Sequence, residues 1–216
     1  ARRMDRLEAL KADLFKINPD IRVSIAELDV NNHDQVFAVF KQFIKEFGSL
    51  DRVIVNAGMG KGASLGTGYF AANKQTAITN FVSAIAQCEA ALEHFRERNE
   101  GHLVMISSIS AVRGFRRAMT VYAASKAAVS VLTEGIRVDL LNTPIKATTI
   151  HPGFIRSEIN EKVKNTPFMV DTETGCRAIL KAIEKEGSSY YVPSWPWSIM
   201  ARLMKFFSLG IIARMS

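Results

Sequence analysis

The sequence predicts a doubly wound α/β fold, in which helices cover both faces of a parallel sheet and give three α/β/α layers. Two features of the chain favour this class. Short apolar runs of strand type alternate with longer segments of helical periodicity, without a long linker or an internal repeat. Several of the short runs are apolar nearly throughout, as strands buried on both faces of a parallel sheet are.

Five short runs are expected to form the strands. They read IRVSIAEL (21–28), RVIVN (52–56), HLVMIS (102–107), KATTI (146–150) and SYYV (189–192). Apolar residues at helical spacing predict helices between them, from Val36 to Phe47 and around 74–98. Ligands of such sheets bind beyond the carboxyl ends of the strands, so the informative residues should follow each strand.

Composition narrows the class of protein. The 216 residues fit one domain, and the net charge of +7 is spread without a basic run among aromatic residues, so no nucleic-acid surface is expected. Cys88 and Cys176 stand far apart in no metal or redox spacing, which favours a reducing, cytoplasmic location. The four histidines form no ligand cluster, and no metal is expected. No stretch is long and apolar enough to span a bilayer.

The stretch VYAASKAA (121–128) places Tyr122 four positions ahead of Lys126. Residues four apart lie on one face of a helix, one turn from each other. An ammonium held beside a phenol favours the phenolate and lowers the tyrosine pKa toward the range in which it can exchange protons. Because the pattern is short, it also arises in helices with one core tyrosine and one solvated lysine. The rest of the chain must therefore supply partners.

Such partners follow the neighbouring strands. HLVMIS ends at Ser107 and Ser108, a loop's length before Tyr122, and Asn80 lies on the preceding predicted helix. A hydroxyl, a phenol, an ammonium and an amide can thus meet at one edge of the sheet. The glycine-rich stretch NAGMGKGASLGTG (56–68) imitates dinucleotide, hydrolase and phosphate-loop motifs, but each match lacks a required part, and a mobile loop is predicted.

Five pieces of the chain occur in the order and spacing typical of one family. They are VNAG (55–58), Asn80, ISSISA (106–111), YAASK (122–126) and HPGFIRS (151–157). With them the chain resembles the short-chain dehydrogenase/reductase family, single-domain type. The resemblance implies a Rossmann-like catalytic domain over residues 1–192, followed by a tail over 193–216.

The resemblance also implies catalytic roles. Tyr122 would exchange a proton with the substrate oxygen, and Lys126 would lower its pKa and hold the nicotinamide ribose. Ser108 would donate a hydrogen bond to the same oxygen, and Asn80 would hold a water that connects Lys126 to solvent. Ser108 is preferred to Ser107 because the residues that follow it fit the family's frame.

A nicotinamide cofactor is implied in the same way. The residues expected to contact it are Asp29, Val30, Asn56, Ala57, Gly58, Tyr122, Lys126, Pro152, Gly153, Ile155 and Ser157. Asp29 would meet the adenine amine, and the segment 152–157 would wrap the nicotinamide. Arg2 and Arg3 stand at the end of the family's second strand, where relatives that prefer NAD carry an acid. Guanidinium groups suit a 2′-phosphate, so NADP(H) is expected to be preferred to NAD(H).

One departure from the family pattern concerns the start of the chain. The family's glycine-rich T-G-x-x-x-G-x-G segment, with the first strand and helix, should precede Ala1 and is absent. Either this part of the native protein is missing from the chain, or the protein is an inactive, truncated relative. The first is favoured, because the catalytic set is intact and a buried sheet without its first strand would leave backbone groups unpaired.

The leading hypothesis is an NADP(H)-dependent oxidoreductase that acts on an apolar ketone or secondary alcohol. Two alternatives are a 3-oxoacyl-thioester reductase of the fatty-acid type and a non-catalytic, cofactor-sensing protein on the same fold. The helices around 74–98 and 122–140 correspond to those that family members pack across a two-fold axis. A homodimer or homotetramer is therefore expected.

The final stretch, WPWSIMARLMKFFSLGIIARMS (195–216), has three cations and no acid. Its apolar residues fall on neighbouring helical stripes. Arg202 and Lys205 interrupt the apolar run, which is therefore too short and too charged to span a bilayer. It is expected to line an apolar substrate pocket, to lie on an anionic membrane surface, or to pack on a partner subunit. The first two uses imply a hydrophobic, lipid-like substrate, which is the favoured class.

Overall fold

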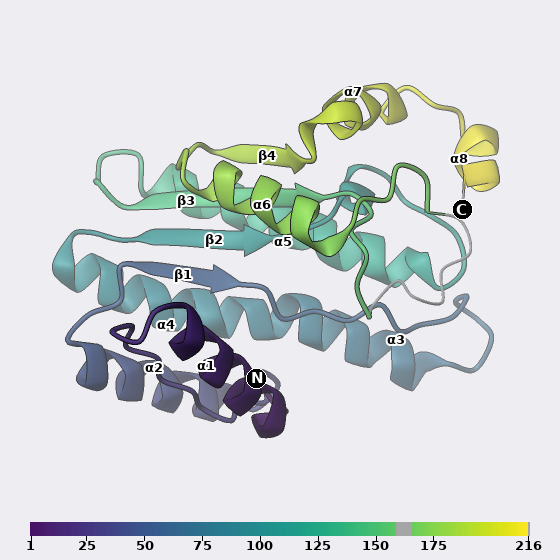
Figure 1. The fold of residues 1–216 in the computed structure, drawn as a ribbon. Helices are drawn as coiled ribbons and strands as arrows, with labels where there is room; N and C mark the ends of the chain where they lie inside the picture. The colour runs from purple at the N-terminus through teal and green to yellow at the C-terminus, as the bar shows by residue number, and fades with distance from the viewer. Residues whose placement is uncertain (159–165, 216) are drawn as a thin grey trace.

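The structure is a computed structural model that describes residues 1–158 and 166–215. Its centre is a four-stranded parallel sheet in the order β1-β2-β3-β4 (Figure 1). The strands are β1 (Arg52–Val55), β2 (His102–Ile106), β3 (Lys146–Pro152) and β4 (Ser189–Val192). They correspond to four of the five predicted strands.

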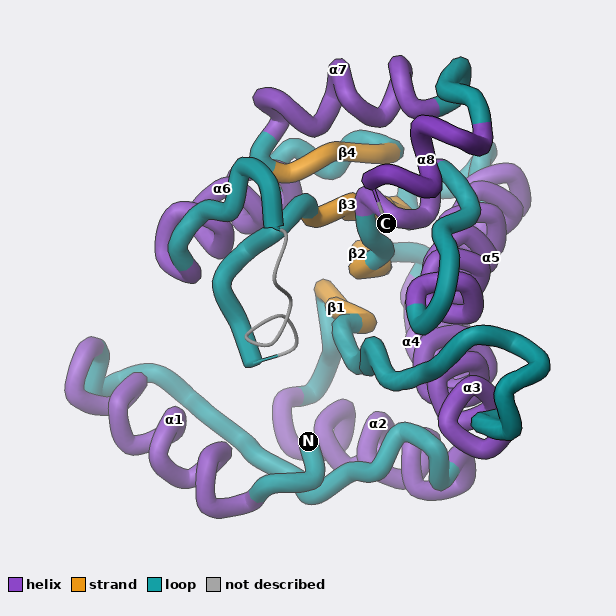
Figure 2. The backbone as a smooth tube through the Cα atoms, turned by 90° about the vertical axis from the view of Figure 1, so that its right-hand side faces the viewer, coloured by secondary structure: helices purple, strands orange, loops and turns teal. Residues whose placement is uncertain are grey.

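Helices cover both faces of the sheet, which confirms the predicted fold class (Figure 2). On one face lie α4 (Ser83–Arg98) and α5 (Met119–Asp139), and on the other lies α6 (Thr172–Ile183). Beyond the two edges lie α7 (Ser194–Met204), next to β4, and α2 (His33–Phe47), next to α4. The remaining helices are α1 (Met4–Ile17), α3 (Phe70–Ala77), a π-helix (Ile78–Val82), a 3-10 helix (Ile109–Val112) and α8 (Leu209–Met215).

The central strand β2 shows why an apolar run predicts a strand that is buried on both faces. Leu103 and Met105 pack among side chains of α4 and α5, whereas Val104 packs with Ile183 of α6 and Val192 of β4. Successive side chains of a strand point to opposite faces. Because both faces of β2 are covered, the positions from Leu103 to Ile106 are apolar, and Leu103, Val104 and Met105 are fully buried. The strand begins at His102, which is buried with its Nε2 2.8 Å from Thr148 Oγ1.

The predicted strand over 21–28 is wrong. This segment joins no ladder. Leu28 N donates to Ala1 O (2.9 Å), Ala1 N donates to Ala26 O (3.4 Å), and Ile21 N donates to Asn18 O (3.2 Å). A strand needs a neighbour that satisfies its N–H and C=O groups in register. Among the described residues, the sheet ends at β1, and no strand lies between β1 and this segment. Its β-branched residues therefore do not become a strand.

Helix α7 belongs to the core. Trp197, Ala201 and Met204 recur at helical spacing, are buried, and pack with Ile109 of the 3-10 helix. The first part of the C-terminal tail thus touches the element that follows Ser108. No helix within the described ranges is both long and apolar enough to cross a membrane.

Candidate active site

Ser108 stands where β2 passes into the 3-10 helix, beyond the carboxyl end of the strand. Its side chain caps that helix, because Ser108 Oγ accepts from Ser110 N (3.2 Å) and from Ser110 Oγ (2.9 Å). A further hydrogen bond joins the Ser108 hydroxyl and the Tyr122 phenol and affects the tyrosine pKa. Since both bonds with Ser110 use Ser108 as acceptor, the serine proton is directed to the Tyr122 oxygen. The structure brings Ser108 and Tyr122 together, as the sequence predicted.

Lys126 lies one turn after Tyr122 in α5 and is 5% exposed. Its ammonium donates to the carbonyl of Ile106 (2.8 Å), and burial lowers its pKa to about 8. Burial raises the pKa of Tyr122, and the opposing effect of the hydrogen bond with Ser108 is smaller. The expectation that Lys126 lowers the tyrosine pKa is therefore not met in this structure. The physical reason is that desolvation dominates while the ammonium bonds to a carbonyl.

Asn80 lies in the π-helix that interrupts the long helical segment between Phe70 and Arg98. Its amide oxygen accepts from Met59 N (2.8 Å), and its amide nitrogen donates to Met59 O (2.9 Å) and Ser125 Oγ (3.0 Å). The side chain thus fastens the loop after β1 to α5. Both of its N–H donors are used in this way, so a water held by Asn80 would bond to an oxygen atom of this residue. Single-turn π-helices of this kind occur frequently at functional sites.

Gly58 shows how closely the loop after β1 approaches this centre. A Cβ atom placed there would lie 3.3 Å from Lys126 Nζ and 3.5 Å from Asn80 Oδ1. Asn56 and Ala57 precede it in the same loop, directly after β1. The absence of a side chain at Gly58 therefore leaves room beside the lysine ammonium.

Ser107 has a different role from Ser108. Its hydroxyl donates to Lys126 O (2.9 Å) and pairs with Ser130 Oγ (2.8 Å), and it is buried. Ser107 therefore ties the end of β2 to α5 behind the site. This geometry agrees with the choice of Ser108 as the residue that faces the substrate.

His151 supports Ser108 from behind. Its Nδ1 lies 3.3 Å from Ser108 O, its Nε2 lies 3.1 Å from Ser189 Oγ, and its ring stacks on Tyr191 with centroids 4.8 Å apart. Burial lowers the pKa of His151, which favours the neutral ring. A neutral imidazole can donate through one nitrogen and accept through the other, as these contacts require.

The segment after β3 meets α7 at Gly153. Gly153 N donates to Val192 O (2.8 Å), and a Cβ atom at this glycine would lie 1.9 Å from Trp197 Nε1. The indole N–H is buried and has no hydrogen-bond partner among the described residues. Phe154 and Phe168 meet the indole edge-on, with centroids 5.8 and 5.9 Å away. An aromatic cluster thus borders the segment that begins at Pro152.

The other predicted residues of this segment are less closely connected to the centre. Ile155 forms a bridge with Val170 and packs on Gly175, where an added Cβ would lie 2.5 Å from its side chain. Ser157 follows two positions later within the described part of the chain. This segment therefore packs against α6 where it leaves the sheet.

Asp29 and Val30 lie in the turn that leads into α2. Asp29 Oδ1 accepts from Asn31 N (3.0 Å), and Asn31 Oδ1 accepts from Thr79 Oγ1 (3.1 Å) and Ser83 Oγ (2.9 Å). These bonds anchor the predicted adenine contact to the helix that carries Asn80. A surface pocket of about 270 Å³ adjoins the turn and is lined by Asn31, Ala71, Lys74, Gln75 and Ile78.

Arg2 and Arg3 lie at the surface, away from the serine–tyrosine pair. Arg3 forms an ion pair with Glu158 at 3.2 Å, and Arg6 bonds to the same carboxylate. Arg2 is exposed and makes no ion pair with a described residue. The pair between Arg3 and Glu158 is solvent-exposed, so it contributes little to stability and leaves the guanidinium available to a stronger anion.

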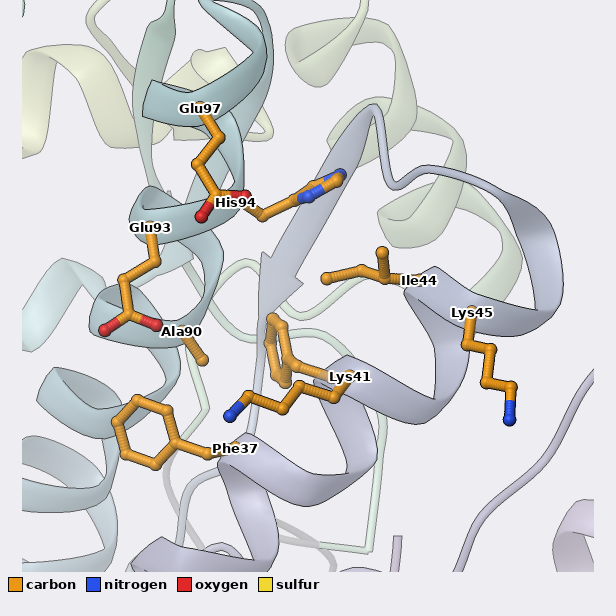
Figure 3. A pocket seen from close by; sticks show the side chains of 9 residues that line it. Phe37, Lys41, Ile44, Lys45, Ala90, Glu93, His94 and Glu97 are labelled. Carbon is orange, nitrogen blue, oxygen red and sulfur yellow. The ribbon is translucent and has the colours of Figure 1, made fainter.

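A pocket of about 280 Å³ lies away from this centre. It lies between α2 and α4 (Figure 3), and it is lined by Phe37, Phe40, Lys41, Ile44, Lys45, Ala90, Glu93, His94 and Glu97. None of the predicted site residues borders it. The lysines and glutamates at its rim come from the two facing helices, and its apolar side chains belong to their packing.

Sequence reasoning expected the final stretch to line a substrate pocket, but it did not foresee the contact of Trp197 in α7 with Gly153. Trp197 follows Gly153 by many positions, and no local pattern links the two. Arg113 was missed as well, although its guanidinium donates to the carbonyls of Met204 (2.6 Å) and Phe207 (3.1 Å) at the end of α7. The signal that could have pointed to Trp197 is the density of tryptophan and methionine after β4.

Comparison with known proteins agrees with this geometry. A family model described as short chain dehydrogenase matches residues 1–167. An uncharacterized oxidoreductase of Mycobacterium tuberculosis is 50% identical over 94% of this chain and 81% of its own length. A farnesol dehydrogenase of Aedes aegypti is 34% identical over 74% of this chain and 66% of its own length.

The fold is similar to that of solved proteins as well. A short-chain type dehydrogenase/reductase of Mycobacterium marinum superposes with a TM-score of 0.78 at 22% identity, over 90% of this chain and 82% of that one. The family match, the identity to the mycobacterial relative and the shared fold agree with one another. The chain therefore belongs to the short-chain dehydrogenase family of oxidoreductases, which use nicotinamide cofactors.

Proposed function

We propose that this protein transfers a hydride between NADP(H) and an apolar ketone or secondary alcohol, with Tyr122 as the general acid/base. The observation that carries the proposal is the hydrogen bond between Ser108 and Tyr122, with the buried ammonium of Lys126 one turn further along α5. These three groups meet at the carboxyl edge of the sheet, where ligands of this fold class bind.

The residues present fit a nicotinamide cofactor. The ammonium of Lys126 has three donors, and one of them is used by Ile106 O. A buried ammonium with free donors is costly unless a ligand supplies acceptors, and ribose hydroxyls do so. A side chain at Gly58 would crowd this ammonium, because its Cβ would lie 3.3 Å from Lys126 Nζ. The cofactor would supply or accept the hydride, while Lys126, Gly58 and the 152–157 segment would hold its nicotinamide end.

The two hydroxyls act on the substrate oxygen. During reduction, a hydride reaches the carbonyl carbon, and the C=O double bond becomes a single bond whose oxygen gathers negative charge. Ser108 donates a hydrogen bond to that oxygen, and Tyr122 gives it a proton to complete the alcohol. Oxidation runs the same steps backwards, with the tyrosine as base.

The direction of the Tyr122 pKa shift bears on this role. A pKa raised by burial keeps the phenol protonated at neutral pH, which is the form that an acid in carbonyl reduction needs. Lys126, with a pKa of about 8, can pass on a proton near neutrality more readily than an ordinary lysine.

Three features support an apolar substrate. Phe154, Phe168 and Trp197 cluster at the segment that begins at Pro152. The 3-10 helix that follows Ser108 packs on the apolar inner face of α7. A relative with 34% identity is a farnesol dehydrogenase, and farnesol is a long apolar alcohol.

A series of methyl ketones of increasing chain length tests the function. With NADPH we expect kcat/KM to rise by about threefold to fourfold for each methylene that enters the pocket, because burying one methylene contributes about 0.8 kcal/mol. Steady-state rates from acetone to long-chain methyl ketones measure this slope. A flat series, or no turnover of any member, contradicts the proposal. Turnover confined to 3-oxoacyl thioesters supports the alternative reductase.

The preference for NADP(H) is tested at Arg2 and Arg3. Replacing both by alanine should raise KM for NADPH by at least roughly 10- to 100-fold, because even one lost hydrogen bond to a charged group costs about 1.5–3 kcal/mol. KM for NADH should change little. Arg6→Ala is the matched control, since Arg6 shares the Glu158 contact but has no predicted cofactor role. Equal efficiency of the two cofactors in the unmodified enzyme refutes the preference.

A homodimer or homotetramer is part of the proposal. The outer faces of α4 and α5 expose apolar side chains, among them Val82, next to α4, and Ile85, Val131 and Val138. Such faces are typical of helices that pack across a two-fold axis. Sedimentation of the intact protein measures the state directly.

A further inference from the structure

Helix α7 is apolar on two opposite faces. Its inner face is buried against the 3-10 helix, as described above. Its outer face carries Ile199 and Leu203 and continues into Phe206, with exposed fractions of 46%, 46% and 87%. The solvent face of a surface helix is ordinarily polar. A second apolar face on the same helix therefore indicates that something other than water covers it.

The apolar row continues into α8. Leu209 and Ile211 are 79% and 43% exposed, whereas Ile212 is buried and holds α8 on the protein. Both views show α8 on the side of the sheet to which the strands' carboxyl ends point (Figures 1 and 2). Ile199, Leu203, Phe206, Leu209 and Ile211 are called the α7–α8 surface below. This surface reaches the edge of the fold that carries Ser108 and Tyr122.

The charges of this part of the chain identify the partner. Arg202, Lys205 and Arg214 are exposed, and residues 194–215 contain no acid. A second copy placed by a two-fold axis would set the same patch against itself and bring these cations together. Anionic lipid headgroups instead pair with all three, while the apolar side chains enter the acyl boundary. Charge complementarity therefore favours lipid over a second copy.

We propose that the α7–α8 surface docks the protein on the interface of a bilayer that contains anionic phospholipid. The surface is fixed to the catalytic edge by Arg113, whose guanidinium donates to the carbonyls of Met204, Lys205 and Phe207. Arg113 directly follows the 3-10 helix that Ser108 caps. Docking in this way turns the site toward the bilayer, where an apolar substrate is concentrated. The link to substrate rests on the proposed function, whereas lipid binding does not.

Vesicle co-sedimentation without cofactor or substrate tests the docking. Protein is mixed with vesicles of phosphatidylcholine alone or of phosphatidylcholine and phosphatidylserine in equal parts. We expect binding to the mixed vesicles, lowered roughly 30-fold by Arg202→Gln with Lys205→Gln, since each basic residue near an anionic surface contributes about a fivefold factor. Phe206→Ser should lower binding at least about tenfold by removing one buried aromatic side chain.

Matched controls lie on α6 and in the turn directly after it, on another face of the protein. Leu180→Ser removes an apolar side chain that is 55% exposed, and Lys181→Gln with Lys185→Gln removes two exposed cations. These variants should bind mixed vesicles as the parent does. Equal binding to both vesicle types, or equal losses in the α6 and α7 variants, overturns the proposal.

Two further readouts separate the remaining explanations. If Phe206→Ser changes the oligomeric state in sedimentation velocity and leaves vesicle binding intact, the surface belongs to a second copy and the proposal fails. Turnover of a small water-soluble ketone is followed on the same samples. A protein that binds mixed vesicles through this surface but turns over no ketone contradicts the proposed function and leaves the docking proposal standing.

Discussion

Tyr122→Phe is expected to lower kcat for ketone reduction on the order of 10³-fold, because a positioned proton donor contributes about 10²–10⁴-fold to such a step. The substitution removes one oxygen atom and keeps the ring. Tyr122 is buried, and burial is the larger effect on its pKa, so the phenyl ring of the variant should keep the same position. Fold and cofactor affinity should be nearly unchanged.

Tyr190→Phe provides the matched control for that loss. Tyr190 lies on β4 and packs with the cluster around Val104, on the opposite side of the sheet from α5. Rates with NADPH, thermal melting and cofactor binding should be measured for both variants. A Tyr122→Phe enzyme that retains more than about a tenth of its activity contradicts the acid/base role, because removing a proton donor costs more than that.

Gly153→Ala is expected to destabilise the fold by about 3 kcal/mol, near the upper end of what overpacking costs. The new Cβ would lie 1.9 Å from Trp197 Nε1 and 2.2 Å from its Cε2, and neither β3 nor the buried α7 can move away freely. For a domain of this size the melting temperature should fall by roughly 6–12 °C. Calorimetry or circular dichroism measures the change.

Two further variants isolate the cause. Gly135→Ala lies on the exposed side of α5 with no atom within 4 Å of the new Cβ, and alanine should stabilise a helix interior there by about 0.5–1 kcal/mol. Gly153→Ala combined with Trp197→Leu should recover part of the loss, since the smaller side chain clears the clash. A Gly153→Ala protein as stable as its parent shows that the contact with α7 is not tight.

The strands were predictable where one rule decided them. β2 is apolar from Leu103 to Ile106 because two helical layers cover it, and a run of apolar residues predicts that directly. The run over 21–28 also contains isoleucine and valine but has no neighbour in the sheet, and composition carries no information about neighbours. Strand type was therefore assigned correctly only where a pairing partner exists.

The site was predictable to the extent that it is local. Tyr122 and Lys126 share a helix, and Ser108 closes the preceding strand, so spacing brought them together. The π-helix around Asn80 was not foreseeable, because one additional residue per turn leaves no mark on an apolar pattern. The contact of Trp197 with Gly153 depends on how α7 packs after β4, which is a tertiary outcome.

The pKa of Tyr122 is the clearest correction. The proximity of a lysine predicts a lowered value, but proximity along the helix does not settle what the ammonium bonds to. Here Lys126 donates to Ile106 O, and desolvation governs both side chains. The depth of burial, which a sequence does not give, therefore reverses the expected direction.

Hydride transfer itself can be followed with NADPH that carries deuterium at the transferable position of the nicotinamide. The intact enzyme should place this deuterium on the carbinol carbon of the alcohol formed from a long-chain methyl ketone, and mass spectrometry of the product detects it. Tyr122→Phe should bind the same cofactor and yield almost no labelled alcohol. Cofactor binding without any labelled product from the unmodified enzyme, or equal labelling by both proteins, would contradict the account.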